Sequence, residues 1–321
     1  MGCGVALMAC DCPTQILADT DTLPRPGGTI VRKAEGAGLT PAGDGLYGMV
    51  LDGGGNYSIL RWPYPALNAY ESIVTSTDEL GFPCAVGSDL FFIAWVGDDV
   101  QLRKVPAAGG SVTVVQTWLE GLHGDIDMWG LRLHDGLLWA GFYEYNAGFT
   151  NQRTGLRSID PSSGAFTEYE FSDGPDDGST PHLSWGTVVV ATDGGIWAQM
   201  HDQPGTGNTG LARFDGAAFS TTDPVLSPDT PAPLADGTVR AWDFSVVGGE
   251  AKVFEPDMSG TTDPCMAGSN DLLLRVRFMV AYTDDHTLVI YNASTDALVA
   301  VACDAPAPVS SGWIVGAVGF T

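Results

Sequence analysis

The residues best suited to chemistry stand in two short segments of the 321-residue chain. In the first, His123, Asp125 and Asp127 occupy alternate positions, and alternate residues of an extended segment project to the same side. Imidazole and carboxylate groups placed in this way can hold a divalent cation, and carboxylate oxygens suit calcium. A turn whose aspartate side chains accept backbone hydrogen bonds would explain the same residues. The segment makes Ca2+ a candidate ligand, while nothing in the sequence requires a cofactor.

The second segment combines aromatic and amide side chains. Its candidate ligand-binding residues are Tyr143, Tyr145, Asn146, Phe149, Asn151 and Gln152. Exposed rings can pack against the C–H faces of a sugar while amides bond its hydroxyl groups. Rings that cap the edge of a sheet would give the same pattern. We regard this segment as the best candidate for a binding loop.

The sequence contains no motif that fixes a catalytic residue. It has neither the Gly-x-Ser-x-Gly nucleophile turn nor the His-Glu-x-x-His zinc motif. Paired carboxylates for glycoside cleavage could be drawn from the 39 acidic residues in many ways, so no pair stands out. We therefore assign no catalytic residue, and the sequence leans toward a non-catalytic protein.

The charge of the chain excludes one class of partner. Lys and Arg number 14 against 39 Asp and Glu, which gives a net charge of −25 that repels phosphate backbones and anionic membranes. No apolar run approaches the roughly 18 residues of a membrane helix. Six cysteines permit fifteen disulfide pairings, among which the sequence cannot choose. We expect no nucleic-acid binding and no membrane insertion.

A repeat indicates the elements that position both segments. An Asp-Gly turn, or a variant of it, recurs before an apolar strand, as in Asp135-Gly136-Leu137-Leu138-Trp139. The turns begin at Asp44, Asp89, Asp135, Asp193, Asp236 and Asp271, and a seventh phrase begins at Gly312. Their spacings, between 35 and 58 residues and mostly near 45, are typical of propeller blades, each a four-stranded sheet around a central axis. The sequence predicts an all-β protein, a β-propeller of seven blades, with six as the alternative.

A second phrase follows each turn and should form the third strand of each blade. It occupies residues 58–63, 101–106, 155–160 and 210–215, with weaker copies at 250–255 and 286–291. The seventh turn has no such successor, whereas residues 29–34 show the pattern without a turn before it. We therefore expect the last blade to combine carboxy-terminal and amino-terminal strands, which removes free sheet edges. Residues 1–27 would form an amino-terminal extension and residues 28–321 the propeller.

The Asp-Gly-x-Leu-Trp-Ala phrase resembles that of bacterial propellers whose repeats carry such turns. The Gly-His and Trp-Asp pairs of WD repeats and the Ser-x-Asp-x-Gly-x-x-Trp boxes of sialidases are missing. The resemblance is to an architecture and implies no particular chemistry. The repeated Trp139 and Trp197 should pack between blades, because a large apolar residue that recurs in register with a structural repeat belongs to the core.

Three functions fit these observations. The favoured one is a non-catalytic structural or receptor-binding component of a large assembly, a bacteriophage virion above all, as a tail-tip, fibre or decoration protein outside the cell. Its partners would be neighbouring subunits, bound through residues 1–27, and a host-surface glycan or protein. The alternatives are a glycan-active enzyme, hydrolase or lyase, with its site at the propeller channel, and a cell-envelope or secreted binding protein.

Overall fold

The structure is a computed structural model of the whole chain, and its description covers the residues whose placement is defined. These are residues 14–19, 25–27, 29–30, 39–42, 45–63, 69–81, 83–118, 124–146, 148, 150–175, 180–191, 193–201, 209–222, 228–233, 239–243, 250–262, 276–282, 287–292, 297–302 and 314–315. They contain antiparallel strands and no helix, so none of them forms a helix long and apolar enough to cross a membrane.

The described strands form six antiparallel sheets that follow one another along the chain. The first sheet contains β2 (Thr29–Ile30), β3 (Leu39–Ala42), β4 (Gly45–Leu51), β5 (Tyr57–Pro63) and β6 (Glu71–Ser76). The second contains β7 (Glu79–Leu80), β8 (Cys84–Val86), β9 (Asp89–Val96), β10 (Asp99–Pro106) and β11 (Thr113–Trp118). The third contains β12 (Asp125–His134), β13 (Leu137–Tyr145), β14 (Gln152–Ile159) and β15 (Phe166–Gly174).

The other three sheets complete the series. The fourth contains β16 (His182–Val190), β17 (Ile196–His201), β18 (Thr209–Phe214) and β19 (Phe219–Thr221). The fifth contains β20 (Pro228–Pro233), β21 (Val239–Asp243), β22 (Glu250–Phe254) and β23 (Gly260–Thr262). The sixth contains β24 (Val276–Tyr282), β25 (Thr287–Asn292), β26 (Ala297–Ala302), β27 (Ile314–Val315) and the amino-terminal β1 (Thr14–Asp19).

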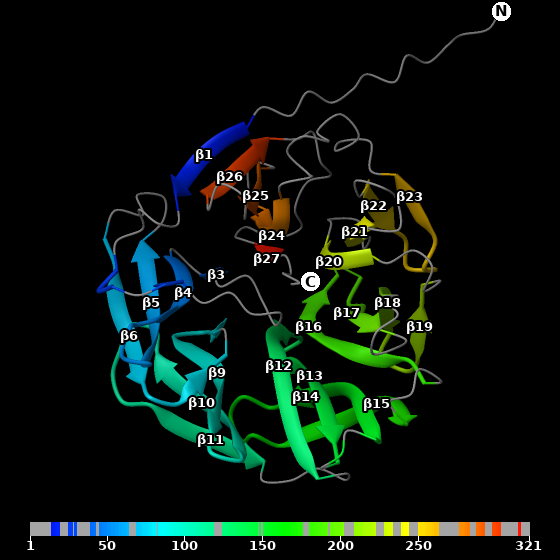
Figure 1. Cartoon of the computed structure of the whole chain (residues 1–321), viewed down its shortest axis with the longest axis horizontal. Coiled ribbons are helices and arrows are strands. Elements are labelled where there is room, and N and C mark those ends of the chain that lie inside the picture. Colours follow the sequence, from blue (N-terminus) through cyan, green and yellow to red (C-terminus); the bar gives the residue numbers. More distant parts are fainter. Residues whose placement is uncertain are drawn as a thin grey trace, which may run out of the picture.

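The six sheets close into a ring (Figure 1). Their inner strands β3, β8, β12, β16, β20 and β24 each contact the next, and β24 contacts β3. Outer strands such as β6, β11 and β19 lie at the rim. The architecture is a β-propeller, which confirms the predicted all-β fold class.

The described residues form six sheets rather than the seven expected. The error lies in the last repeat, where residues 286–291 were expected to be a third strand. They overlap β25, the second strand of its sheet. The phrase at Gly312 does not begin a seventh sheet of the described residues. Its strand β27 pairs with β24 and so belongs to the same sheet.

The two ends of the chain meet in the sixth sheet, as expected, but through a different segment. The amino-terminal strand is β1, which pairs with β26 from Thr14–Val301 to Asp19–Ala297. Thr29 and Ile30 pair instead with β4 in the first sheet. The predicted division after residue 27 thus leaves a propeller strand outside the propeller. Subunit contact through residues 1–27 stays a prediction.

Hydrophobic side chains fill the spaces between neighbouring sheets, and the repeated tryptophans are among them. Trp139 belongs to the core between the third and fourth sheets, and Trp197 to the core shared with the fifth, which confirms their predicted role. The turn that precedes Trp139 needs positive φ at both central residues, 49° at Asp135 and 76° at Gly136. Aspartate and glycine tolerate that conformation, and such turns match the twist of a hairpin.

Candidate functional site

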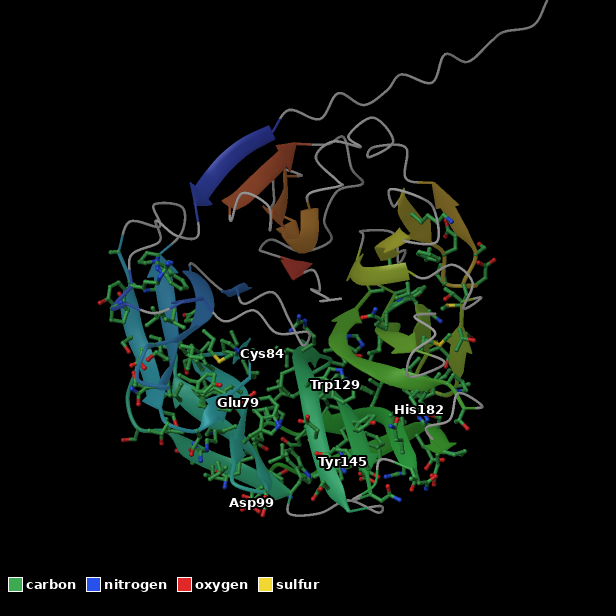
Figure 2. The ribbon with its side chains drawn as sticks, viewed as in Figure 1. Glu79, Cys84, Asp99, Trp129, Tyr145 and His182 are labelled. Carbon is green, nitrogen blue, oxygen red and sulfur yellow. The ribbon has the colours of Figure 1, made fainter. Side chains whose placement is uncertain are left out.

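The candidate site lies on one edge of the ring, where the inner strands of three successive sheets begin. In the third sheet Asp125 is opposite Tyr145, which is opposite Gln152. In the second sheet Glu79 is opposite Trp95, and in the fourth His182 is opposite His201. We call this set of residues the entry edge. Figure 2 shows its labelled members Glu79, Tyr145 and His182 on the second, third and fourth sheets in turn.

Asp127 is held in place by a hydrogen bond between two sheets. The indole Nε1 of Trp95, on β9, donates to Asp127 Oδ1 at 2.6 Å, and the backbone N–H of Met128 donates to the same oxygen at 2.7 Å. Two donors on one carboxylate oxygen fix the side chain where the second and third sheets meet. The entry edge thus carries a defined negative charge where the second and third sheets meet.

Tyr145 stands beside this charge. Burial raises the pKa of its phenol, and the negative charges of Asp127 and Asp125 raise the pKa further. The phenol therefore stays protonated at neutral pH and can donate a hydrogen bond. Its ring centroid lies 5.4 Å from that of Tyr143, and the ring packs on the core between the third and fourth sheets. The arrangement combines a fixed proton donor with two carboxylates.

The loop between β13 and β14 is shorter than the segment predicted to bind a ligand. Asn146 organises it, because its Oδ1 accepts hydrogen bonds from the N–H groups of Thr150 and Asn151 at 2.9 and 3.4 Å. Its Nδ2 donates to Thr150 Oγ1 at 2.9 Å. Asn151 Nδ2 donates to Asp173 Oδ1 at 3.5 Å. The amides that were candidates for sugar recognition therefore also shape the loop.

The six predicted ligand-binding residues divide into three groups. Tyr143 and Gln152 lie within strands and are buried, 6% and 2% exposed, so the expectation that they stand on an exposed loop is wrong for these two. The extra residues of this repeat lengthen the hairpin strands instead of the loop. Tyr145, Asn146 and Asn151 are half-buried at the edge. Phe149 lies outside the described residues. A ligand-binding role stays a prediction.

The predicted metal ligands do not form a metal site in the part of the chain that the structure describes. His123 lies outside the described residues, and Asp127 Oδ1 already accepts two hydrogen bonds. Among the described residues, no group of three His, Cys, Asp or Glu side chains could hold an ion. The two aspartates alone do not fit calcium, which takes six to eight oxygen ligands.

A series of hydrogen-bonded polar side chains, which sequence reasoning missed, joins the third and fourth sheets next to the entry edge. The buried His182 shares a hydrogen bond of 3.0 Å between its Nδ1 and Ser172 Oγ. Ser172 Oγ lies 3.0 Å from Thr154 Oγ1, which accepts the N–H of Leu183 at 3.0 Å. No local pattern could have revealed it, because its members come from three strands. The same is true of Trp95, which is 32 residues from Asp127.

Comparisons with known proteins were made at the levels of sequence and fold. No protein family matches the sequence, and no curated protein resembles it. Among solved structures, a candidate gluconolactonase has a TM-score of 0.52 at 10% identity, covering 93% of this chain and 94% of that one. A luciferin-regenerating enzyme has a TM-score of 0.54 at 10% identity, covering 94% and 99%. An acylaminoacyl peptidase from Pyrococcus horikoshii has a TM-score of 0.50 at 9% identity over 81% of this chain and 45% of that one. What they share with this chain is the fold.

These comparisons overturn the favoured prediction of a non-catalytic virion component. The similar propellers that match over nearly their whole length are named as enzymes, and none of those reported is a virion or receptor-binding protein. One ground for the prediction was the absence of a short catalytic motif, which is weak evidence in a propeller. A propeller assembles a site from strand ends that are distant in sequence, as Trp95 and Asp127 show.

Proposed function

We propose that this protein is a hydrolase that opens a sugar-derived lactone or ester at the entry edge. The observation that carries the proposal is the placement of the protonated Tyr145 phenol beside the carboxylates of Asp125 and Asp127. The full-length likeness to propellers named as a candidate gluconolactonase and a luciferin-regenerating enzyme supports an enzyme of small molecules. A glycan-active enzyme was already an alternative indicated by the sequence.

Each of the three residues has a distinct role in this proposal. Asp125 is exposed at the first position of β12 and acts as the general base. Tyr145 donates a hydrogen bond to the carbonyl oxygen of the substrate. Asp127, fixed by Trp95, holds the local negative charge that keeps the phenol protonated. The partly buried setting of Asp127 and Tyr145 strengthens their interactions relative to water.

The reaction uses water as its only co-reactant. Asp125 takes a proton from a water molecule, whose oxygen adds to the carbonyl carbon of the ester. The oxyanion of the tetrahedral intermediate accepts the hydrogen bond from Tyr145. The C–O bond to the ring oxygen then breaks, and the protonated Asp125 returns its proton to the leaving oxygen. The products are a hydroxyl group and a carboxylic acid, which ionises.

The test compares hydrolysis of a gluconolactone, an aryl ester and an aryl glycoside by the purified chain. We expect turnover of the lactone or the ester. Asp125→Asn should lower kcat at least 100-fold, as loss of a general base does. Tyr145→Phe should lower kcat by about 100-fold, as loss of an oxyanion donor does. Asp98→Asn makes the same chemical change on the exposed turn after β9 and should leave kcat unchanged.

Two results would refute the proposal. One is turnover of the lactone or ester that Asp125→Asn and Tyr145→Phe leave intact, which places the chemistry elsewhere. The other is no turnover of any of the three substrates by a chain shown to be folded by circular dichroism. Turnover of the aryl glycoside alone would replace ester hydrolysis by glycoside cleavage.

A further inference from the structure

Ser172 and His182 form a pair of side chains that the proposed reaction does not use. Ser172 Oγ lies 3.0 Å from His182 Nδ1, within the reach at which a histidine takes the proton of a hydroxyl nucleophile. Ser172 is half-buried and keeps part of its surface in solvent, whereas His182 is 1% exposed. A serine in contact with a histidine is the central arrangement of nucleophilic acyl transfer.

The hydrogen bonds of Thr154 set the direction of the Ser172 proton. Thr154 is fully buried, and its Oγ1 accepts the backbone N–H of Leu183 at 3.0 Å. Because a buried hydroxyl group also needs an acceptor for its own proton, Thr154 donates to Ser172 Oγ, which lies 3.0 Å away. We therefore assign the proton of Ser172 to the bond with His182 Nδ1, which accepts it as the unprotonated nitrogen of a neutral imidazole.

The pair crosses the contact between the third and fourth sheets. Ser172 belongs to β15, the outer strand of the third sheet, and His182 is the first residue of β16, the inner strand of the fourth (Figure 2). Asp125 is on β12, three strands away from β15, which corresponds to roughly 14 Å. The pair is therefore separate from the carboxylates of the proposed hydrolase site.

A matched pair of hydroxyl groups in the first sheet lacks the histidine. Ser58 on β5 lies opposite Thr75 on β6, with their hydroxyl oxygens 2.9 Å apart, just as Thr154 on β14 lies opposite Ser172 on β15. Ser58 is half-buried, as Ser172 is, and among the described residues no histidine bonds its hydroxyl group. The two serines thus have the same kind of position in their sheets and differ in the imidazole.

We infer that Ser172 is a nucleophile that accepts the acyl group of a small, uncharged ester, with His182 as its general base. The carboxylate of Asp173, exposed next to Ser172 in a chain of net charge −25, disfavours an anionic ester. This activity is additional to the proposed hydrolase function and does not rest on it.

Water is the only co-reactant of this activity. His182 Nδ1 takes the proton of Ser172 as Oγ adds to the carbonyl carbon of the ester. The C–O bond to the leaving oxygen breaks, that oxygen receives the proton from His182, and the acyl group remains on Ser172 Oγ. A water molecule then attacks this acyl group with its proton passing to His182, which returns it to Ser172 Oγ. The products are an alcohol and a carboxylic acid.

The test locates the adducts of an alkyl fluorophosphonate on the full wild-type chain by peptide mass spectrometry. The reagent replaces the ester, since Ser172 Oγ bonds the phosphorus atom, fluoride leaves and His182 takes the proton. We expect Ser172 to react about 100-fold faster than Ser58 or more, because a positioned general base contributes at least that factor. Equal rates at the two serines, or no adduct at Ser172, overturn the inference. The comparison is made within one protein and requires no variant to fold.

A substitution of the histidine separates proton transfer from simple contact. His182→Asn places an amide near the position of Nδ1, so it can keep a hydrogen bond to Ser172 but cannot act as a base. Labelling of Ser172 should fall about 100-fold in this variant. His134→Asn makes the same change at a half-buried histidine beside Asp135 and should leave labelling unchanged. Labelling at the wild-type rate in folded His182→Asn protein contradicts the role of His182 as a base.

Discussion

The two faces of the third sheet are held to their neighbours by opposite means. The face toward the second sheet carries a partly buried network of ionised side chains beside its hydrophobic core, whereas the face toward the fourth carries stacked aromatic rings. Both faces come from the same three strands, β13, β14 and β15. The contrast separates two ways in which one sheet can be fixed between two others.

The charged face is built around two arginines. Arg153 bonds Glu144 at 3.1 Å, Glu168 at 2.8 Å and Glu170 at 2.9 Å. Arg157 bonds Glu168 and lies 3.4 Å from Glu144, and its guanidinium also stacks on the rings of Phe142, Trp118 and Phe166 at 4.7–5.6 Å. Because Trp118 belongs to the second sheet, Arg157 links the two sheets directly.

Burial and charge act against each other in this network. Burial lowers the pKa of Arg157, although Glu168 and Glu144 oppose the effect. For Arg153, which is less buried, hydrogen bonds to Glu170, Glu168 and Glu144 outweigh burial and raise the pKa. The network is stable as a set, but each member depends on the others because an unpaired buried charge is costly.

The aromatic face depends on no single partner. Trp139 stacks on Tyr169 with ring centroids 5.3 Å apart, and Phe214 of the fourth sheet lies 4.7 Å from Tyr169 and 4.9 Å from Phe219. Such contacts are non-directional enough for another apolar side chain of similar size to replace one ring. From this comparison we expect one substitution in the charged face to cause a large loss of stability, and one substitution in the aromatic face to cause a smaller loss.

The largest effect should come from Arg157→Met. The change leaves Glu144, 1% exposed, with one fewer cation and keeps most of the side-chain volume. Breaking a buried ion network from one side should lower the free energy of unfolding by about 3–5 kcal/mol. Urea denaturation followed by tryptophan fluorescence measures it. Lys104→Met, at a half-exposed pair of 3.7 Å with Asp89, should cost less than about 1 kcal/mol. Equal losses in the two variants would show that burial does not govern the network.

A smaller effect is expected from Phe214→Leu on the aromatic face. The buried ring contacts Trp139, Tyr169 and Phe219, and leucine keeps an apolar group there. Loss of ring contacts and of part of the volume should cost about 1–2 kcal/mol. The same urea titration measures it at low and high salt. A loss that changes with salt would contradict an apolar origin.

The charged face should also respond to acid, while the aromatic face should not. The hydrogen bond from Arg153 and the charge of Arg157 hold the pKa of Glu168 below its usual value of 4.5, against the effect of burial. A lowered folded-state pKa contributes stability that is complete above the unfolded value and is lost as pH falls through the folded value.

We therefore expect Glu168→Gln to be less stable than wild type at pH 7, with the difference shrinking toward pH 3. Phe214→Leu should keep a constant difference from wild type over the same range. Urea midpoints at pH 7, 5, 4 and 3 test both expectations. A stability difference between Glu168→Gln and wild type that is independent of pH would show that the carboxylate charge of Glu168 does not contribute to stability.

The sequence predicted the aromatic face better than the charged one. Trp139, on this face, recurs in register with the turns, so its burial follows from the repeat. In β14, by contrast, Arg153 and Arg157 alternate with less polar residues, a pattern typical of a strand with one solvated face. All eight residues of β14 are buried, because acids from β13 and β15 and a neighbouring sheet cover the arginines.

The candidate site could be predicted only in part for a related reason. Asp125, Asp127 and Tyr145 attracted attention through their local pattern; Asp125 and Tyr145 lie on the entry edge, and Asp127 lies two residues further along β12. Trp95, which fixes Asp127, gives no local signal because the contact depends on how two sheets meet. The blade count of seven depended on the phrase at Gly312, whose strand β27 belongs to the sixth sheet of the described residues.

The smallest effect sharpens the comparison most directly, because it holds distance constant and changes burial. Arg61 Nη1 lies 2.8 Å from Glu71 Oε2, the same separation as between Arg153 and Glu168, but the Glu71 side chain is 55% exposed. Arg61→Gln should therefore cost only about 0.2–1 kcal/mol. In 1 M salt the cost should shrink, because the screening length falls to about 3 Å, close to the separation of this exposed pair. The loss in Arg157→Met should persist in that salt, and if both losses disappeared together, water would reach the charged face as freely as it reaches Glu71.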